Sequence, residues 1–461
     1  MVKEDTKYDV AVIGGGPAGI MAAIQASSPE QSQRACPERS RRVVLIEKNK
    51  QLGKKLLLTG GGRCNLTNAE FNLKKLVENY HNGEFLFHAF SVFGPKESIK
   101  FFENLGVKTK IETNNRVFPK SDKASEILEA LKKELAKNPS ASDIRLSSVE
   151  ALRAGKKVEI LYNSEVVDVE KKGDKITKII LKDGEVTAAK YILATGGKSY
   201  PQTGSNGVGY KLAEKLGHTI VKLSPALCPI RLKPDKSPQG NFDGPVTIPP
   251  KADLVGNLQG ISLKNIRINV LQNKKKMLSE DGEILFTHFG ISGPAVLNIS
   301  GKVGELLEKG GVKICIDLFP ELNHEEVLKS FEEILKKYPR QIIKNILAEI
   351  APEKFVEILL NVIKIDKSKI ANNMSKIEKA AIVKILKNFE LTVEDVFGFD
   401  GARVTRGGIS LKEIDHRTMK SKVIDNLFFA GEIIDVDGKT GGFDLQMCWS
   451  TGFIAGQDKQ P

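Results

Sequence analysis

A glycine-rich loop near the start of the chain has the residues and the spacing that bind the pyrophosphate of a dinucleotide. Gly14, Gly16 and Gly19 form a GxGxxG pattern, and Glu47 follows at the end of the next apolar run. Glycines at these positions permit a tight turn and let backbone N–H groups approach a pyrophosphate. An acidic residue in the place of Glu47 can accept hydrogen bonds from a ribose hydroxyl. Together these features predict dinucleotide binding.

The elements that must position this loop are predicted on both sides of it. Residues 8–13 (YDVAVI) suit a buried parallel strand, 20–26 a helix, and 43–46 (VVLI) a second buried strand. This order is a βαβ unit. The connection between the helix and the second strand is longer than the usual pattern, and its surplus falls in the polar run Ser27–Arg42. We interpret that run as a surface insertion, which costs little.

A second polar segment, Gly53–Asn68, suits a flat, hydrogen-bonding ligand pressed against the backbone. Its three successive glycines, Gly60–Gly62, offer main-chain N–H groups without side-chain obstruction. Lys54 and Arg63 can face phosphates, and the neutral polar residues beyond them supply further hydrogen bonds. Cys64 has no partner in CxxC spacing, so we interpret it as packing against the ligand rather than exchanging disulfides.

The end of the chain returns to the same chemistry. An apolar run at Leu427–Ala430 predicts a buried strand, and the segment Gly441–Gln446 opens a helix that runs toward Ala455. The N-terminus of a helix carries partial positive charge and unpaired N–H groups. Aimed at the N1/C2=O edge of a flavin, it would stabilise the negative charge of the reduced ring. Asp435 is placed to reach a ribityl hydroxyl.

The middle of the first half predicts further strands but no second dinucleotide domain. Short strands are expected at 157–161, 166–170 and 176–181, and another buried strand at 191–197 ends in small residues. In reductases with two dinucleotide domains, a second complete GxGxxG follows a strand. The glycines within 204–209 have no buried strand directly before them, so we predict no separate nicotinamide domain.

The sequence supplies only weak candidates for a catalytic side chain. Arg63, His288 and Arg406 could polarise a substrate, but none has a spacing argument behind it. A lone histidine is more often a satisfied structural group than a proton donor. No metal site is predicted, because the five cysteines are far apart and never form CxxC.

Composition indicates an ordinary globular protein. Of its 461 residues, 41% are hydrophobic and 28% are charged. This length is more than one hydrophobic core usually supports. The net charge of +13 permits binding to an anionic partner, but no basic stripe interleaved with aromatic residues stands out, so nucleic acid is not an expected partner. No apolar run reaches the ~18 residues of a membrane span. A cytoplasmic location and a small-molecule substrate are the expectation.

Changes in composition divide the chain into four parts. Residues 1–197 and 397–461 are expected to form one FAD-binding domain of the Rossmann-like α/β class, assembled from both chain ends. Residues 198–320 are rich in proline, glycine and short β-like runs, and predict an inserted β-barrel-like domain. Residues 321–396 have a helical pattern of apolar residues and are rich in lysine, which predicts a small helical domain.

At this point the chain resembles a known family. The segments GGGPAG, GKKLLLTGGGRCNLTN, RVFPKSDKAS, ATGGKSYPQTGSNGVGY, FTHFGISGPAVL and FFAGEIIDVDGKTGGFDLQ occur in this order. They are similar to the bacterial NAD(P)/FAD-dependent oxidoreductases that include bile-acid Δ-reductase-like and aminoacetone-oxidase-like proteins. The likeness covers nearly the whole chain. It implies an FAD domain split between the two ends, with barrel and helical parts between.

The resemblance completes the set of residues expected to hold the cofactor. These are Gly14, Gly16, Pro17, Ala18, Gly19, Glu47, Lys48, Lys54, Thr59, Gly60, Gly61, Gly62, Arg63, Cys64, Asn65, Val166, Ala194, Thr195, Gly196, Gly197, Gly431, Glu432, Asp435, Gly441, Gly442, Asp444, Leu445 and Gln446.

The expected activity is hydride transfer between flavin N5 and a small organic substrate, with NAD(P)H as a transient co-substrate and electron donor. Three alternatives stay open at this point. They are a flavoprotein that acts on tRNA or another RNA, a small-amine oxidase that uses oxygen, and a flavin-binding module without turnover.

Overall fold

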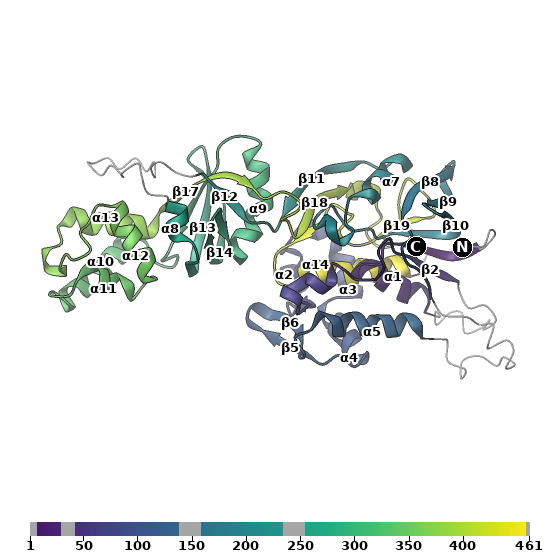
Figure 1. Cartoon of the computed structure of the whole chain (residues 1–461), viewed down its shortest axis with the longest axis horizontal. Coiled ribbons are helices and arrows are strands. Elements are labelled where there is room, and N and C mark those ends of the chain that lie inside the picture. Colours follow the sequence, from purple (N-terminus) through teal and green to yellow (C-terminus); the bar gives the residue numbers. More distant parts are fainter. Residues whose placement is uncertain (1–6, 29–41, 138–157, 234–253, 458–461) are drawn as a thin grey trace. The chain divides into compact units, whose positions relative to one another are not determined.

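The protein folds as two compact units, each with its own core. The computed structural model describes residues 7–28, 42–137, 158–233 and 254–457 (Figure 1). The first unit consists of residues 1–224 and 404–461, and the second of residues 225–403. The predicted insertion Ser27–Arg42 lies almost wholly outside the described residues.

A mixed sheet forms the centre of the first unit, with β9 antiparallel to both β10 and β8. Its strand order is β7-β2-β1-β10-β9-β8, and β19 pairs with the end of β10. The contacts of β1 with β2 and β10, of β2 with β7, and of β10 with β19 are parallel. The strands are β1 Lys7–Ile13, β2 Val43–Ile46, β7 Val158–Leu161, β8 Val166–Lys172, β9 Lys175–Leu181, β10 Gly184–Leu193 and β19 Leu427–Phe429.

Two helices from opposite ends of the chain pack closely beside this sheet. Helix α1 (Pro17–Ala26) and helix α14 (Phe443–Gly456) approach so closely that a Cβ on Gly452 would lie 2.4 Å from the Ala18 carbonyl oxygen. A Cβ on Gly456 would lie 2.6 Å from the Ala22 carbonyl oxygen. Glycine at these two positions therefore lets the C-terminal segment complete the first unit (Figure 1).

Smaller elements surround this core. Strands β3, β6 and β5 form one small sheet, β20 pairs with β4, and β11 pairs with β18. The elements are η2 Leu56–Gly62, β3 Thr67–Asn68, α2 Leu73–Val77, β4 Tyr80–His81, η3 Gly83–Leu86, α3 Phe87–Val92, α4 Pro95–Asn104, β5 Thr109–Glu112, η4 Thr113–Asn115, β6 Arg116–Pro119, α5 Ala124–Ala136, η5 Pro201–Thr203, α7 Val208–Leu216, β11 Ile220–Ala226, β18 Val404–Ile409, η7 Leu411–Glu413 and β20 Asp437–Gly438.

The second unit contains a closed six-stranded barrel in the order β12-β15-β14-β13-β16-β17. Helices cover it and share its core, as the rings of Phe355 and Phe389 show with centroids 5.4 Å apart. The elements are β12 Ile230–Leu232, α8 Leu254–Leu258, β13 Ser262–Gln272, β14 Lys275–Thr287, β15 Gly290–Ser292, α9 Pro294–Leu307, β16 Lys313–Asp317, α10 His324–Lys337, α11 Ile343–Ala348, α12 Glu353–Val362, η6 Ala371–Asn373, α13 Lys376–Lys387 and β17 Phe389–Val396.

The observed boundaries differ from the predicted ones in two ways. The first unit continues to Ser224, not 197, because α7 and β11 pack on its sheet and on β18. The predicted barrel (198–320) and helical part (321–396) form one unit that ends at Arg403, because they share one hydrophobic core. Residues 389–396, assigned to the helical part from the sequence, are instead the barrel strand β17.

Candidate functional site

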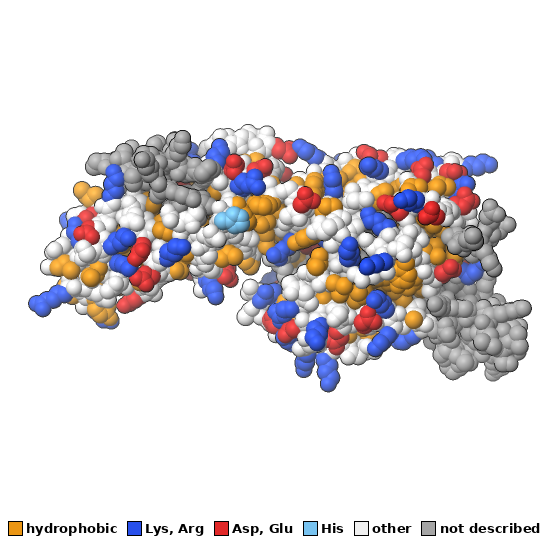
Figure 2. Space-filling model, viewed as in Figure 1, with side chains coloured by type: hydrophobic (Ala, Val, Ile, Leu, Met, Phe, Trp, Pro, Cys, Tyr) orange, Lys and Arg blue, Asp and Glu red, His pale blue; other side chains and the backbone are white. Residues whose placement is uncertain are grey.

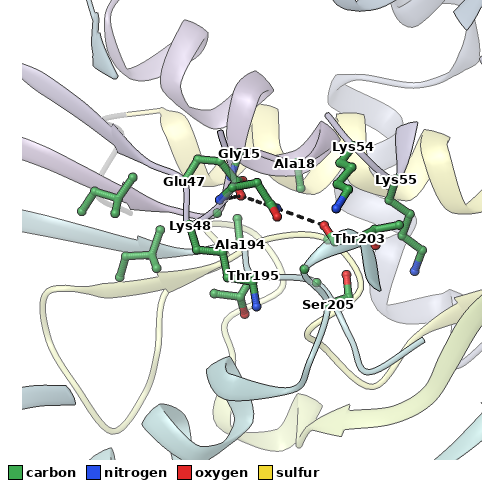
Figure 3. A pocket seen from close by; sticks show the side chains of 18 of the residues that line it. Gly15, Ala18, Glu47, Lys48, Lys54, Lys55, Ala194, Thr195, Thr203 and Ser205 are labelled. Carbon is green, nitrogen blue, oxygen red and sulfur yellow. Dashed lines mark hydrogen bonds between the residues drawn. The ribbon is translucent and has the colours of Figure 1, made fainter. Parts of the chain in front are cut away.

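A cleft opens in the first unit where parallel strands end, as expected for this kind of sheet. It encloses about 860 Å³ of space, part of it open to solvent, and residues from both ends of the chain line it (Figure 3). The turns after β1, β2, β10 and β19 contribute Gly14, Glu47, Thr195 and Gly431. The predicted βαβ unit therefore borders the cleft, together with the predicted C-terminal strand.

The three glycines of the GxGxxG pattern have different structural roles. Gly14 has φ +108°, and a Cβ there would lie 2.4 Å from the Ala194 carbonyl oxygen. A Cβ on Gly19 would lie 1.8 Å from the Gly14 carbonyl oxygen, because α1 packs close to β1. A Cβ on Gly16, at the start of α1, would meet nothing within 4 Å. Two glycines thus form the turn, and the third leaves space at a helix N-terminus, where an anion is stabilised.

Glu47 follows directly after β2 and lines the cleft. It is 7% exposed and closes the loop by accepting the Gly15 N–H on Oε2 at 2.8 Å. Its Oε1 accepts the backbone N–H of Asn49 at 2.7 Å and Nδ2 of Asn49 at 2.6 Å (Figure 3). These bonds fix the carboxylate at the cleft.

Three lysines line the same cleft. Burial lowers the pKa of Lys48, and the neighbouring carboxylates of Glu165 and Glu47 oppose that shift. Lys54 Nζ donates to the carbonyl oxygen of Gln202 at 2.7 Å. Lys55 Nζ donates to Glu432 Oε2 at 2.8 Å. Three glutamates, Glu47, Glu165 and Glu432, line the same cleft, so the positive charge of the lysines is offset there.

The segment 199–205 borders the cleft and is tied to the loop after β2. Asn49 Nδ2 donates to the Thr203 carbonyl oxygen at 3.0 Å, and Lys55 Nζ donates to Ser199 Oγ at 2.9 Å. The lining residues that the sequence predictions missed include Asn49, Lys55, Thr203, Gly204 and Ser205. The run SNGVGY, which begins at Ser205, was a local signal for the last of these, and Lys55 lies in the segment Gly53–Asn68 that was predicted to face the ligand.

Five buried side-chain polar atoms lack hydrogen-bond partners among the described residues, and two of them lie at or near the cleft. One is Oγ1 of Thr195, in the cleft wall, and the other is Oδ1 of Asp435, which follows the cleft residues Gly431 and Glu432. Asp435 is 8% exposed, and burial raises its pKa. An unmet acceptor or hydroxyl in a buried position fits a ligand rich in hydroxyl groups. The residues present thus fit a dinucleotide with a polyol chain.

In the loop Thr59–Asn65 the three glycines adopt the left-handed backbone conformation that favours glycine, but Arg63 is engaged by other side chains. Gly60, Gly61 and Gly62 have φ values of 58°, 68° and 88° and are exposed. The Arg63 guanidinium lies over the Phe118 ring at 4.1 Å and pairs with Asp122 and Glu112, so it is not free to meet a phosphate.

Cys64, next in this loop, is fully buried, and burial raises the pKa of its thiol to about 12. A buried thiol of this kind is inert. This agrees with the prediction that Cys64 does not exchange disulfides, whereas its packing against the ligand stays a prediction, since Cys64 does not line the cleft.

Some of the polar groups around the start of α14 already have hydrogen-bond partners within the protein. With its amide oriented to suit its neighbours, Asn65 accepts the Gly442 N–H at 3.1 Å. Asp444 Oδ1 accepts the Gly438 N–H at 2.8 Å, and burial raises the pKa of this carboxyl well above its usual value. Gln446 is fully buried, and its amide is bonded to Thr67, Phe93 and Ser450. Its side chain therefore has a structural role.

The residues predicted to hold the cofactor divide into those that line the cleft and those that do not. Those that line the cleft are Gly14, Gly16, Pro17, Ala18, Glu47, Lys48, Lys54, Val166, Ala194, Thr195, Gly196, Gly431 and Glu432. Those that do not line it are Gly19, Thr59, Gly60, Gly61, Gly62, Arg63, Cys64, Asn65, Gly197, Asp435, Gly441, Gly442, Asp444, Leu445 and Gln446. The second set surrounds the start of α14 and the loop before β3, except for Gly19 and Gly197, which pack behind the cleft.

Neither Arg63 nor Arg406, the two catalytic candidates in the first unit, lines the cleft. His288 is exposed in the turn between β14 and β15 of the second unit, with its ring 4.8 Å from that of Phe289. Arg406 donates to both carboxylate oxygens of Asp437, at 3.0 and 3.1 Å. Within the described ranges, no group of three or more His, Cys, Asp and Glu residues could hold a metal ion.

Among the residues that the structure describes, no helix is both long and apolar enough to cross a membrane.

The fold and the cleft define a Rossmann-like dinucleotide-binding protein assembled from both chain ends. Residues 8–458 match the family described as the HI0933-like protein Rossmann domain. The chain belongs to this family, which confirms the predicted family and the predicted class of fold.

Two curated relatives are similar over nearly their whole length. The 3-dehydro-bile acid delta(4,6)-reductase of Clostridium scindens is 34% identical over 97% of this chain and 98% of its own. The ribosomal RNA dihydrouridine synthase of Haemophilus influenzae is 29% identical, with 96% of each chain covered. Among solved structures, the 3-ketosteroid delta1-dehydrogenase of Sterolibacterium denitrificans is similar over 98% of both chains, at 12% identity and a TM-score of 0.45.

Proposed function

We propose that the chain is an FAD-dependent oxidoreductase that transfers a hydride between flavin N5 and a small organic substrate. The observation that carries the proposal is the cleft, where Gly16 leaves space at a helix N-terminus and the buried hydroxyl of Thr195 has no partner among the described residues. Glu47 and the lysines around it complement the ribose and the phosphates of a dinucleotide.

The chain's own residues would bind and orient the cofactor. The N–H groups at the start of α1 would hold the pyrophosphate, and Glu47 the adenosine ribose. Asp435 would accept a hydrogen bond from a ribityl hydroxyl through its unpartnered Oδ1. The flavin, when bound, supplies the hydride chemistry itself, and the protein supplies orientation and electrostatics.

The names of the two relatives suggest the kind of bond that is reduced. One name describes the reduction of ring double bonds in a 3-oxo bile acid, and the other the formation of dihydrouridine in ribosomal RNA. In both reactions the double bond is conjugated with a carbonyl group. We therefore propose that the substrate carries a carbon–carbon double bond activated in this way.

NAD(P)H is the proposed electron donor, binding only transiently. The glycines at 204–209 follow the short helix η5 and open α7, rather than linking a strand to a helix. In the described part of the chain they do not form a second dinucleotide loop. A donor that lacks its own domain would have to reach the flavin from the substrate side.

Anaerobic mixing tests this proposal. The purified protein should be yellow, release FAD on denaturation, and lose its visible flavin absorbance with NADH or NADPH. Adding a steroid 4,6-dien-3-one should then restore the oxidised spectrum. A colourless protein that takes up no FAD would remove the proposal. Bleaching by a small amine but by neither nicotinamide would favour an amine oxidase instead.

A second candidate is a flavoprotein that reduces a base in RNA. It is favoured by the full-length similarity to the ribosomal RNA dihydrouridine synthase and by the net charge of +13. The same reduced protein, mixed with an RNA oligonucleotide that contains uridine, should then form dihydrouridine. Reoxidation by the dienone but not by RNA would remove this candidate.

A further inference from the structure

The helical part of the second unit carries a group of cations that form no ion pair with another described residue, although Glu333 lies one helical turn before Lys336 and Lys337. Lys336 and Lys337 end α10, Arg340 lies in the linker to α11, and Lys376 begins α13. All four side chains are exposed, and none forms an ion pair with another described residue. The sequence contains no acidic residue between Glu333 and Glu349.

Backbone hydrogen bonds bring the linker after α10 and the linker before α13 side by side. Asn372 N–H donates to the Pro339 carbonyl oxygen at 2.9 Å, and Ala371 N–H donates to that of Gln341 at 2.9 Å. Lys379 on α13 lies 3.4 Å from Glu332 on α10, so the end of α10 and the start of α13 are neighbours. The cations therefore share one end of the helical group α10–α13 (Figure 1).

Exposed apolar side chains lie among these cations. The Tyr338 ring is 38% exposed, and Lys337 Nζ lies 5.1 Å from its centroid. Ile377, beside Lys376, is 77% exposed. Over this part of the surface, Figure 2 shows Lys and Arg side chains beside hydrophobic ones, with Asp and Glu side chains among them. We call Lys336, Lys337, Tyr338, Arg340, Lys376 and Ile377 the basic patch.

The stability of the helices does not account for the basic patch. Lysines at the end of α10 favour the helix dipole, but Lys376 is the first residue of α13, where a cation opposes it. The acids nearest to Lys376 are already used: Glu378 pairs with Lys369, and Glu332 with Lys379. A cation placed against the dipole without a partner points to an anionic ligand.

We propose that the basic patch binds the sugar–phosphate backbone of RNA. Lysine and arginine neutralise phosphates, and an exposed aromatic ring among them can stack on a base whatever its sequence. This inference rests on the second candidate function, reduction of a base in RNA. It assigns to the second unit a role in holding the nucleic acid, separate from the cofactor cleft of the first unit.

Fluorescence anisotropy with the full-length protein and a labelled single-stranded RNA of 20 nucleotides tests the inference. The variant Lys336→Gln/Lys337→Gln/Arg340→Gln should bind at least about tenfold more weakly than the wild type at ~50 mM KCl. The slope of log K against log[KCl] should become shallower by about 2, since each single-strand phosphate contact contributes about 0.7. Unchanged flavin content would show that the fold is intact.

A charge-matched control is available in the same unit. Lys274, Lys275 and Lys276 are exposed at the turn between β13 and β14, and Lys274→Gln/Lys275→Gln/Lys276→Gln removes the same charge. The control should keep both affinity and slope. Equal losses in the two triple variants would overturn the inference, as would absence of RNA binding at ~50 mM KCl. Binding to phosphatidylserine vesicles without binding to RNA would overturn it in favour of a membrane surface.

The test separates this inference from the proposed function, because RNA binding is measured with the oxidised protein and needs no turnover. If RNA binds through the basic patch but no dihydrouridine forms, the binding inference stands and the second candidate function fails. If dihydrouridine forms equally well in wild type and patch variant, with equal RNA affinity, the function stands and the inference is overturned.

Discussion

Nζ of Lys55 lies 2.8 Å from Oε2 of Glu432, so an ion pair joins two residues 377 positions apart at the cofactor cleft. The other carboxylate oxygen of Glu432 accepts from Ser199 Oγ and from the Thr405 N–H, both at 2.8 Å. The side chains of Lys55 and Glu432 are 22% and 12% exposed. The pair is therefore largely withdrawn from solvent, and with Ser199 and Thr405 it links four separate chain segments where the cofactor would lie.

Lys55→Met should destabilise the apo-protein by about 1–3 kcal/mol, because it leaves the mostly buried Glu432 without its cation. Urea unfolding measures the loss. Lys50→Met, at a neighbouring exposed lysine, should change stability little. Adding Glu432→Gln to Lys55→Met should recover part of the loss. Equal midpoints for the two lysine variants would show that the ion pair contributes nothing.

The glycine loop permits a second test that separates folding from cofactor binding. Gly16→Ala should keep the fold but bind FAD more weakly, because its Cβ enters open space in the cleft. Gly19→Ala should lose both stability and FAD, since its Cβ would lie 1.8 Å from the Gly14 carbonyl oxygen. Thermal unfolding without FAD, together with an FAD titration, measures both effects. A Gly16→Ala protein that keeps full FAD affinity would contradict the placement of the pyrophosphate.

The βαβ unit could be predicted from the sequence because its signals are local. The apolar run before Gly14, the helix after Gly16 and the strand before Glu47 are contiguous, and each was observed. Residues 389–396 also carried a local signal, since buried Phe389 and Leu391 alternate with less buried residues as in a strand. This alternation of apolar and polar residues was missed because it lies in a lysine-rich region whose pattern is otherwise helical.

The side-chain partners at the site could not be predicted, because they come from distant positions. Arg63 suits a phosphate by its residue type, but β5 and the turn before α5 bring Glu112 and Asp122 to it. Gln446 follows a predicted flavin-binding turn, but its amide meets the Phe93 carbonyl oxygen, 353 positions earlier. Such pairings depend on how the chain folds back on itself, and a single sequence does not show that.

The carboxylate of Asp435 offers a third test, because Oδ1 is buried without a partner among the described residues. Asp435→Asn should leave the apo-protein as stable or slightly more stable, since it removes a buried charge that burial already disfavours. FAD affinity should fall by about tenfold, because the amide replaces an acceptor with a donor. Isothermal titration of FAD and apo-protein unfolding measure the two effects.

A matched control for Asp435→Asn is Asp437→Asn. Asp437 is 5% exposed and paired with Arg406, so this variant should destabilise the apo-protein. If Asp435→Asn destabilises the apo-protein as much as Asp437→Asn does, Oδ1 of Asp435 is satisfied within the protein, and its assignment to the cofactor fails.

His218 lies between Glu413 and Ser421 in an arrangement that resembles a hydrolase triad but is structural. Nδ1 lies 3.0 Å from Glu413 Oε2, and Nε2 lies 2.9 Å from Ser421 Oγ. Ser421 is 4% exposed, and its Oγ also accepts the N–H groups of Val423 and Ile424. A hydroxyl buried in this way cannot reach a substrate, so the imidazole joins α7 to the segment after β18.

This imidazole predicts a pH dependence of stability. Burial lowers the pKa of His218 below its ordinary value of 6.5, and Glu413 opposes the shift. Below about pH 6.5 the unfolded chain therefore binds more protons than the folded one. The stability of the protein decreases as the pH is lowered, until the imidazole of the folded protein is also protonated. His218→Gln should flatten the fall between about pH 6.5 and 5 in urea unfolding. Part of the fall should remain, because the pKa of His88 is also lowered. An unchanged slope would contradict this prediction.

The last prediction concerns the second unit alone, where Lys387 and Asp317 form a buried ion pair. Lys387 Nζ donates to Asp317 Oδ2 at 2.6 Å and to the Phe319 carbonyl oxygen at 2.7 Å, and the side chains are 7% and 12% exposed. Lys387→Met should destabilise this unit by about 3–5 kcal/mol, because Asp317 keeps its charge without a partner. Lys329→Met, at an exposed position on α10, should change the stability of the second unit little.

Circular dichroism and flavin fluorescence, followed in one thermal scan, test the prediction for Lys387→Met. The circular dichroism should show a partial transition at lower temperature as the second unit unfolds. The midpoint temperature of FAD release from the first unit should not change. This separation is expected because the two hydrophobic cores are distinct. If FAD release moves to lower temperature together with the partial transition, the units unfold as one and the prediction is wrong.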